Sequence, residues 1–107
     1  MFDKENILII GSTFEKAKEQ YNNIANEYAQ YGIKVTFYNE SDNDIYAEFS
    51  NLQKFYVISF DDLKQKICTI KINYIYFDKE IPSNEYWDYI DTWVRPELRS
   101  PRTMWQF

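Results

Sequence analysis

The stretch Asn6-Ile7-Leu8-Ile9-Ile10-Gly11 decides the fold, because it is a short, continuous apolar run rich in β-branched side chains. Such a run predicts a strand that is buried on both faces, which is typical of a parallel sheet. Ser12 follows directly and Glu15 lies three residues later, the spacing of a capping box. We therefore expect a strand over 6–11 and a helix that is capped by Ser12.

Apolar side chains then recur at helical spacing, and Gly32 stands where a glycine cap would end the helix. The apolar positions are Phe14, Ala17, Tyr21, Ile24, Ala25 and Tyr28. This strand and helix form the unit from which the remaining elements can be arranged.

Alternating or apolar runs predict further strands over 33–38, 54–60 and 72–77. Residues 45–50 suit either a short edge strand or one turn of helix. We expect a short helix over 61–67 with Asp61 as its cap, and a helix over 84–94 that Pro96 ends. This order predicts an α/β fold, with helices packed on a small, mainly parallel sheet of four to five strands in a P-loop or Rossmann-like layout.

The 107 residues are expected to form one domain, in which 95–107 is a C-terminal tail folded back on the rest. The composition, rich in isoleucine, lysine, asparagine and tyrosine, indicates AT-rich coding sequence, as in low-GC bacteria and their phages. No signal peptide or membrane span is recognised, so we expect a cytoplasmic protein of a bacterial host cell.

Charge and composition exclude several function classes. The net charge of −5 disfavours non-specific binding to nucleic acid. The chain has no histidine, which removes the commonest general base and metal ligand, so Ser-His and Cys-His catalysis and zinc sites are not expected. Cys68 lies among isoleucines and is expected to be a buried, inert thiol. We expect no metal and no cofactor.

A first candidate site is Gly11-Ser12-Thr13, at the junction of the first strand and helix. A helix N-terminus offers free N–H groups to an anion, although neither GxGxxG nor GxxxxGK[ST] occurs in the chain. A capped helix start with no ligand is the alternative interpretation.

A second candidate is Asp78, which directly follows the apolar strand over 72–77. Residues 7–40 followed by 72–80 resemble part of the P-loop NTPase core of phage terminases and helicases, in which a later strand ends in Asp-Glu. The resemblance implies a nucleotide- or nucleic-acid-binding domain with Gly11, Ser12, Thr13 and Asp78 at its site. Lys79 replaces the family's catalytic glutamate and the phosphate-binding loop is missing, so the resemblance implies a degenerate relative without ATP hydrolysis.

Two further groups suit a protein partner. Acidic residues accumulate from Asp78 and Glu80 into the predicted helix over 84–94, and the tail interleaves all three arginines with large aromatic residues, a composition enriched at binding hot spots. A solvated helix face and a tail packed into the core are the alternatives. The expected partner-binding residues are Glu85, Asp88, Asp91, Trp93, Arg95, Arg99, Arg102, Trp105 and Phe107.

Without a catalytic motif, the sequence predicts a small, non-catalytic binding protein encoded by a phage or mobile element. It would bind a larger protein, such as one that processes nucleic acid, and a homodimer is a further option. Nucleic acid is expected to bind only through the Arg/Trp tail. The alternative is the degenerate P-loop-like nucleotide- or nucleic-acid-binding domain, and an enzyme that uses carboxylates alone is a third reading.

Overall fold

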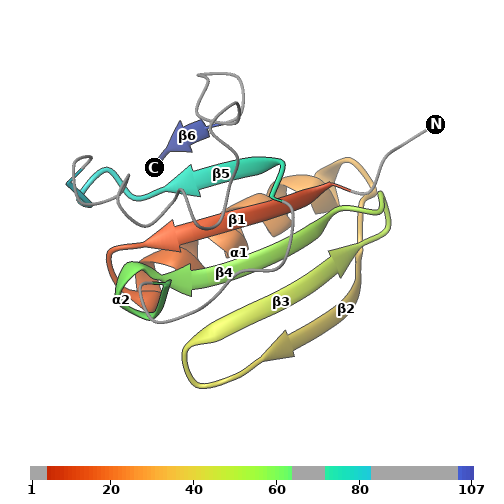
Figure 1. Ribbon diagram of the computed structural model, residues 1–107. Coiled ribbons are helices and arrows are strands. Elements are labelled where there is room, and N and C mark those ends of the chain that lie inside the picture. Colours follow the sequence, from red (N-terminus) through yellow and green to blue (C-terminus); the bar gives the residue numbers. More distant parts are fainter. Residues whose placement is uncertain (1–4, 64–71, 83–103) are drawn as a thin grey trace.

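The structure is a computed structural model, and it describes residues 5–63, 72–82 and 104–107. The predicted helix over 84–94, the end of the one predicted over 61–67, and Cys68 lie outside these residues. Figure 1 shows the described elements. They are β1 (Asn6–Gly11), α1 (Phe14–Gln30), β2 (Val35–Glu40), β3 (Asp44–Phe49), β4 (Lys54–Ser59), α2 (Phe60–Leu63), β5 (Tyr74–Phe77) and β6 (Met104–Gln106).

The described strands form one six-stranded sheet in the order β2-β3-β4-β1-β5-β6. Strand β1 runs parallel to β4 and β5, and β5 runs parallel to β6, whereas β3 is antiparallel to both β2 and β4. The predicted α/β class is confirmed. The expected number of four to five strands is wrong, because the described strands number six, and the sheet is mixed, with parallel pairing of β1, β4, β5 and β6 and antiparallel pairing of β3. The loops around β3 are too short for the crossovers that parallel neighbours need.

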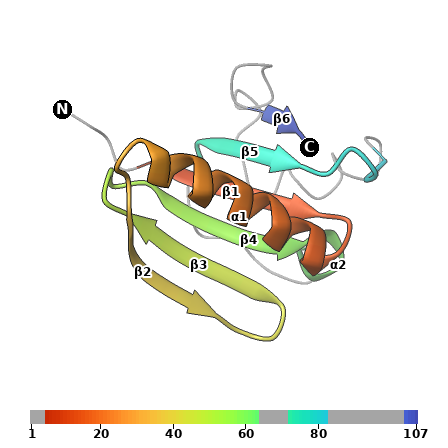
Figure 2. The ribbon, with the colours of Figure 1, turned by 180° about the vertical axis from the view of Figure 1, so that it is seen from behind.

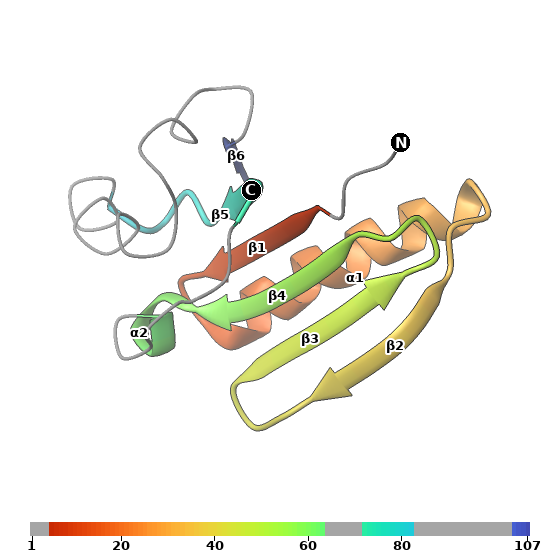
Figure 3. The same ribbon diagram turned by 45° about the vertical axis from the view of Figure 1, so that its right-hand side comes forward.

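Strand β1 is buried on both faces, as its sequence predicts. Its four aliphatic residues, Ile7 to Ile10, are at most 3% exposed. Ile7 and Ile9 join one core cluster, which α1 covers with Ala17 and Tyr21, and Leu8 and Ile10 belong to a second cluster on the other face. Figures 2 and 3 show α1 over β1 and β4, with the β2–β3 hairpin extending beyond it.

Helix α1 starts one residue later than the capping box predicts. Its N-cap is Thr13, whose hydroxyl accepts the N–H of Lys16 at 3.2 Å. The prediction of Ser12 as the N-cap is wrong, because the Ser12 side chain is hydrogen-bonded to Asp78, which follows β5. At the other end Gly32 has a φ of +78° and completes the predicted glycine cap, with its N–H donated to the carbonyl of Ala29.

Two other local predictions are settled by burial and hydrogen bonding. Residues 45–50, left open between helix and strand, fall mostly in β3, where every second residue is buried. Helix α2 begins at Phe60, and the Ser59 hydroxyl accepts the N–H of Asp62 at 3.2 Å. The prediction of Asp61 as the cap is therefore wrong, because Ser59 occupies that role.

The last described residues lie beside β5. Strand β6 pairs with β5 in register, with Trp105 opposite Tyr76. The N–H of Phe107 donates to the carbonyl of Phe77 at 3.0 Å, and the N–H of Lys79 donates to the carbonyl of Phe107 at 2.9 Å. Residues 104–107 thus extend the parallel side of the sheet.

Candidate functional site

The candidate site lies where two neighbouring parallel strands end. Strand β1 ends at Gly11 and is followed by Ser12, while β5 ends at Phe77 and is followed by Asp78. The N–H of Asp78 donates to the carbonyl of Ile10 at 2.9 Å, which continues the ladder one residue beyond β5. The carboxyl ends of parallel strands are where α/β folds commonly bind ligands. We call this place the Asp78 edge, defined by Ser12, Asp78, Glu80 and Lys16.

Ser12 and Asp78 are joined by two hydrogen bonds. The Ser12 hydroxyl donates to Oδ2 of Asp78 at 2.6 Å, and the Ser12 N–H donates to the same oxygen at 3.0 Å. The other carboxylate oxygen, Oδ1, accepts the N–H of Glu80 at 3.0 Å. Asp78 is only 3% exposed, so these bonds supply the partners that a buried carboxylate requires.

Glu80 and Lys16 form the outer part of the edge. The Lys16 ammonium is ion-paired with the Glu80 carboxylate, and both side chains are substantially exposed. The hydrogen bond to Glu80 raises the pKa of Lys16. Since pairs of exposed charges contribute little to stability and exchange readily with water, this pair can open without unfolding the chain.

The buried carboxylate stays ionised at neutral pH. Burial opposes the charge of Asp78, but hydrogen bonds from Ser12 and Glu80, together with the charge of Lys16, lower its pKa below the ordinary value. The anion is thus held by donors from both strand ends.

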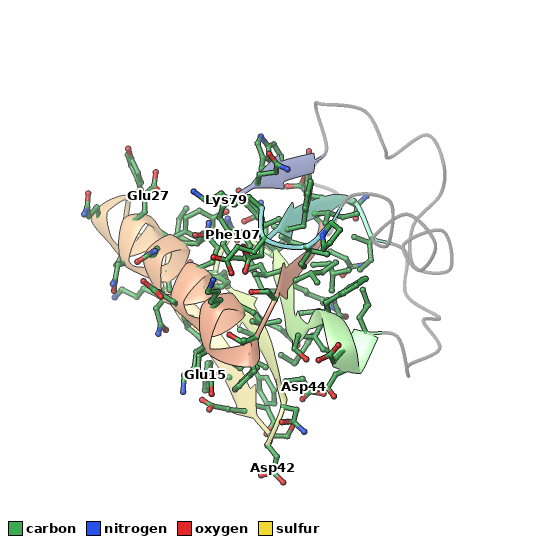
Figure 4. All side chains as sticks on the ribbon, turned by 90° about the vertical axis from the view of Figure 1, so that its left-hand side faces the viewer. Glu15, Glu27, Asp42, Asp44, Lys79 and Phe107 are labelled. Carbon is green, nitrogen blue, oxygen red and sulfur yellow. The ribbon has the colours of Figure 1, made fainter. Side chains whose placement is uncertain are left out.

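A hollow of about 240 Å³ opens beside the edge, between the first half of α1 and the end of β5. Lys79 and Phe107 lie next to each other at its rim (Figure 4). Acidic and basic side chains both line this hollow, so its charge does not favour an anion. Its lining residues are Lys16, Glu19, Gln20, Asn23, Asp78, Lys79, Glu80 and Phe107.

The carboxylates of the Asp78 edge are already engaged by groups of this chain. Both oxygens of Asp78 already accept hydrogen bonds, and Glu80 is paired with Lys16. Within residues 5–63, 72–82 and 104–107, no three histidine, cysteine, aspartate or glutamate side chains gather closely enough to hold a metal. Of the donors expected for an anion, those of Ser12 are engaged, because its hydroxyl and its N–H both donate to Asp78.

Of the residues predicted to bind nucleotide, the structure brings Ser12 and Asp78 into contact, with Gly11 and Thr13 beside them. Gly11 serves packing, because a Cβ there would lie 2.4 Å from the carbonyl oxygen of Thr13 and 2.5 Å from the nitrogen of Ala17. Sequence reasoning missed Lys16, which lies in the first turn of α1, four residues after Ser12. Ser12 precedes the N-cap, so helical spacing does not link the two residues and only the fold brings them to one place.

The residues predicted to bind a partner are mostly outside the described part of the chain. Of these residues the structure describes Trp105, which is 39% exposed and stacked on Tyr74 and Tyr76, and Phe107, which packs against the core cluster under α1. Outside it lie Glu85, Asp88, Asp91, Trp93, Arg95, Arg99 and Arg102.

The chain is similar in fold to the large terminase of a thermophilic bacteriophage, whose structure was solved in complex with ADP. The TM-score is 0.56 at 14% sequence identity, and the match covers 100% of this chain but 33% of that terminase. The likeness supports a distant P-loop-like resemblance at the level of the fold. No protein-family model matches the sequence, and neither does any curated protein. In the described part of the chain, no helix is long and apolar enough to cross a membrane.

The hydrogen bonds of Asp78 predict a pH-dependent loss of stability in the Asp78→Asn variant. Because the folded-state pKa is lowered, the stability from the carboxylate is fully present above the unfolded pKa of about 3.9 and is lost as the pH falls through the folded value. At pH 7 the free energy of unfolding should drop by about 1–3 kcal/mol. Denaturant unfolding at pH 7 and pH 3 measures this free energy. The difference between Asp78→Asn and the wild type should be smaller at pH 3 than at pH 7.

Glu19→Gln is the matched control, since it removes an exposed carboxylate from the same hollow. It should change the free energy of unfolding by less than about 0.5 kcal/mol at both pH values. A loss in Asp78→Asn that is equal at both pH values would contradict the ionised, donor-held state of Asp78.

Proposed function

We propose that this chain is a non-catalytic module of P-loop-like fold, encoded by a phage or mobile element, that binds a larger nucleic-acid-processing protein. The observation that carries the proposal is the Asp78 edge. Where a nucleotide-hydrolysing relative would present a carboxylate to a metal, Ser12 and the N–H of Glu80 occupy both oxygens of Asp78.

The sequence around the edge also supports a role without catalysis. The 107 residues contain no GxxxxGK[ST] segment, and Lys79 follows Asp78 where the resembling family has glutamate. A second nearby carboxylate, Glu80, is paired with Lys16. Neither a nucleophile-activating base nor a phosphate cradle is therefore assembled from the described residues.

Strand β2 supports a role in binding another protein. Among the described strands it lies at one edge of the sheet, and all six of its residues are exposed, including the large apolar residues Val35 (42%), Phe37 (51%) and Tyr38 (44%). The ring of Phe37 contacts that of Tyr46, which in turn contacts Tyr56. These rings form a row from β2 across the face of the sheet opposite α1. Exposed apolar side chains on an unpaired edge are typical of surfaces that bind partners.

The likeness to the phage large terminase supports the choice of partner class. That protein was solved with ADP, and this chain spans 33% of its length. A module with this fold and without its own phosphate-binding loop would depend on a larger protein for any nucleotide-driven step.

The partner-binding role predicts that a tagged chain will capture one near-stoichiometric protein from a nuclease-treated lysate of a low-GC bacterium. Phe37→Ser should reduce the captured amount roughly tenfold, because truncating an aromatic anchor typically costs about 1–2 kcal/mol of binding. Quantitative mass spectrometry of the captured protein measures the effect.

Leu52→Asn is the matched control, because Leu52 is also 51% exposed but lies outside β2, and asparagine tolerates its positive φ of 72°. It should capture as much as wild type. An empty capture would contradict the binding role, and equal capture by Phe37→Ser would exclude β2 as the binding surface.

The second candidate function is nucleotide binding by the chain itself. It is favoured by Lys16 and Lys79, two ammonium groups in the hollow that Asp78 also lines, since lysine can bind phosphate as a point charge.

Thermal unfolding with ADP or ATP and Mg²⁺ separates the two functions. The non-catalytic binding role predicts no change in melting temperature at millimolar nucleotide and no release of phosphate. A rise of several degrees that Lys16→Ala abolishes would instead establish the nucleotide-binding function, because a ligand that binds the folded state stabilises it by mass action. Lys18→Ala, which removes a lysine of the same helix outside the hollow, is the control.

A further inference from the structure

A second hollow, of about 380 Å³, lies on the α1 side of the sheet, toward the ends of β1 and β5 opposite the Asp78 edge. We call it the aromatic hollow. It is built from five separate segments: the residues at the start of β1, the end of α1, the turn before β4, strand β5 and strand β6. Its lining residues are Glu5, Ile7, Tyr28, Gln53, Tyr74, Tyr76 and Trp105.

Three stacked rings form one side of the aromatic hollow. The Trp105 ring lies nearly parallel to that of Tyr76, with centroids 5.0 Å apart and planes 27° apart. It also stacks on Tyr74 at 5.3 Å and 26°. The pairing of Tyr76 with Trp105 across β5 and β6 holds the rings on one face of the sheet. Since 39% of Trp105 is exposed, it remains accessible to a ligand.

A hydrogen-bonded wall positions a carboxylate beside these rings. The Glu5 carboxylate accepts the Gln53 amide N–H at 3.1 Å and the hydroxyl of Tyr74. The Gln53 carbonyl in turn accepts the hydroxyl of Tyr28 at 2.6 Å. This chain of bonds fixes the direction of Glu5, and no ion pair joins Glu5 to a cation within the described residues.

The surroundings of the aromatic hollow are negative. Its described lining contains Glu5 but neither lysine nor arginine. Burial raises the pKa of Tyr28 to about 12, and the charges of Glu5 and Glu27 add to that rise. Burial and then the charge of Glu27 also raise the pKa of Tyr76. A negative field of this kind repels phosphate and carboxylate groups and favours a cation.

We propose that the aromatic hollow binds an organic cation, an ammonium or guanidinium group that lies against the Trp105 and Tyr76 rings with its charge directed at Glu5. Aromatic faces attract such cations, tryptophan most strongly, and a carboxylate in the same site adds a charge-assisted hydrogen bond. The volume suits one basic side chain or a small free amine. The inference rests on the proposed function only for the source of the cation, which would be a lysine or arginine of the bound protein.

Titration of the isolated chain with N-acetyl-arginine amide, followed by the Trp105 indole signal in NMR, tests this site. N-acetyl-citrulline amide is the matched neutral probe, because it has nearly the same shape without the charge. We expect a saturable shift with the arginine probe at about millimolar concentration and a far smaller one with citrulline. Equal shifts with the two probes would overturn the proposal.

Variants identify the groups that recognise the cation. Trp105→Leu and Glu5→Gln should each weaken binding of the arginine probe roughly fivefold or more, as expected for losing a cation–π contact or a charge. Phe37→Leu, at an exposed aromatic residue on a distant strand, should leave it unchanged. Binding that persists at full strength in Glu5→Gln would overturn the proposal even if Trp105→Leu failed to fold.

A five-residue peptide, acetyl-Gly-Gly-Arg-Gly-Gly-amide, separates the two sources of the cation. Tighter binding of the peptide than of the arginine amide supports a protein segment as the ligand, while equal binding supports a free cation. Both outcomes use the isolated chain, so they are independent of whether the tagged protein captures a partner through β2.

Discussion

The double parallel pairing of β1 is the constraint on which the rest of this structure depends. The strand pairs with β4 along its whole length and with β5 from Ile7 to Ile10, and both of its faces are buried. A strand buried in this way requires cover on both sides of the sheet. The parallel directions also bring Ser12 and Asp78 to one end of the sheet, and place Glu5 and Tyr74 toward the other.

The two ends of the sheet differ in chemistry. At the carboxyl end, donors satisfy the buried Asp78 carboxylate, and the mixed charges of the hollow beside it suit neither a strong anion nor a metal. At the other end, Glu5 is held in a hydrogen-bonded wall without a cationic partner among the described residues, beside three stacked rings. The two ends therefore differ in their charges: the first holds a carboxylate paired with Lys16, and the second holds a carboxylate without a cationic partner among the described residues.

This contrast explains why a fold similar to that of a large terminase need not imply the same chemistry. The likeness to a large terminase concerns the backbone arrangement, whereas catalysis depends on groups placed at the strand ends. Here the hydroxyl and the N–H of Ser12 both donate to Asp78. The proposed binding role rests on these hydrogen bonds together with the exposed strand β2.

The sequence predicted those features that depend on a few neighbouring residues. The burial of β1 and the Gly32 cap follow from an apolar run and from a backbone that requires a positive φ. The Ser12 cap failed because its true partner, Asp78, lies 66 residues further along the chain. The antiparallel β2–β3 hairpin was not predicted, because an alternating pattern of apolar residues does not reveal the direction in which a strand runs. The aromatic hollow could not be predicted, since its residues come from five segments that only the fold brings together.

A double-mutant cycle on Ser12→Ala and Asp78→Asn, measured by denaturant unfolding at pH 7, tests most directly whether the Asp78 edge is held closed by its own hydrogen bonds. Two residues in one hydrogen-bonded network should show a coupling free energy of about 1–3 kcal/mol, with the double variant less destabilised than the sum of the two single variants. Additive losses would mean that Ser12 does not hold Asp78, and the carboxylate would then be available to a ligand.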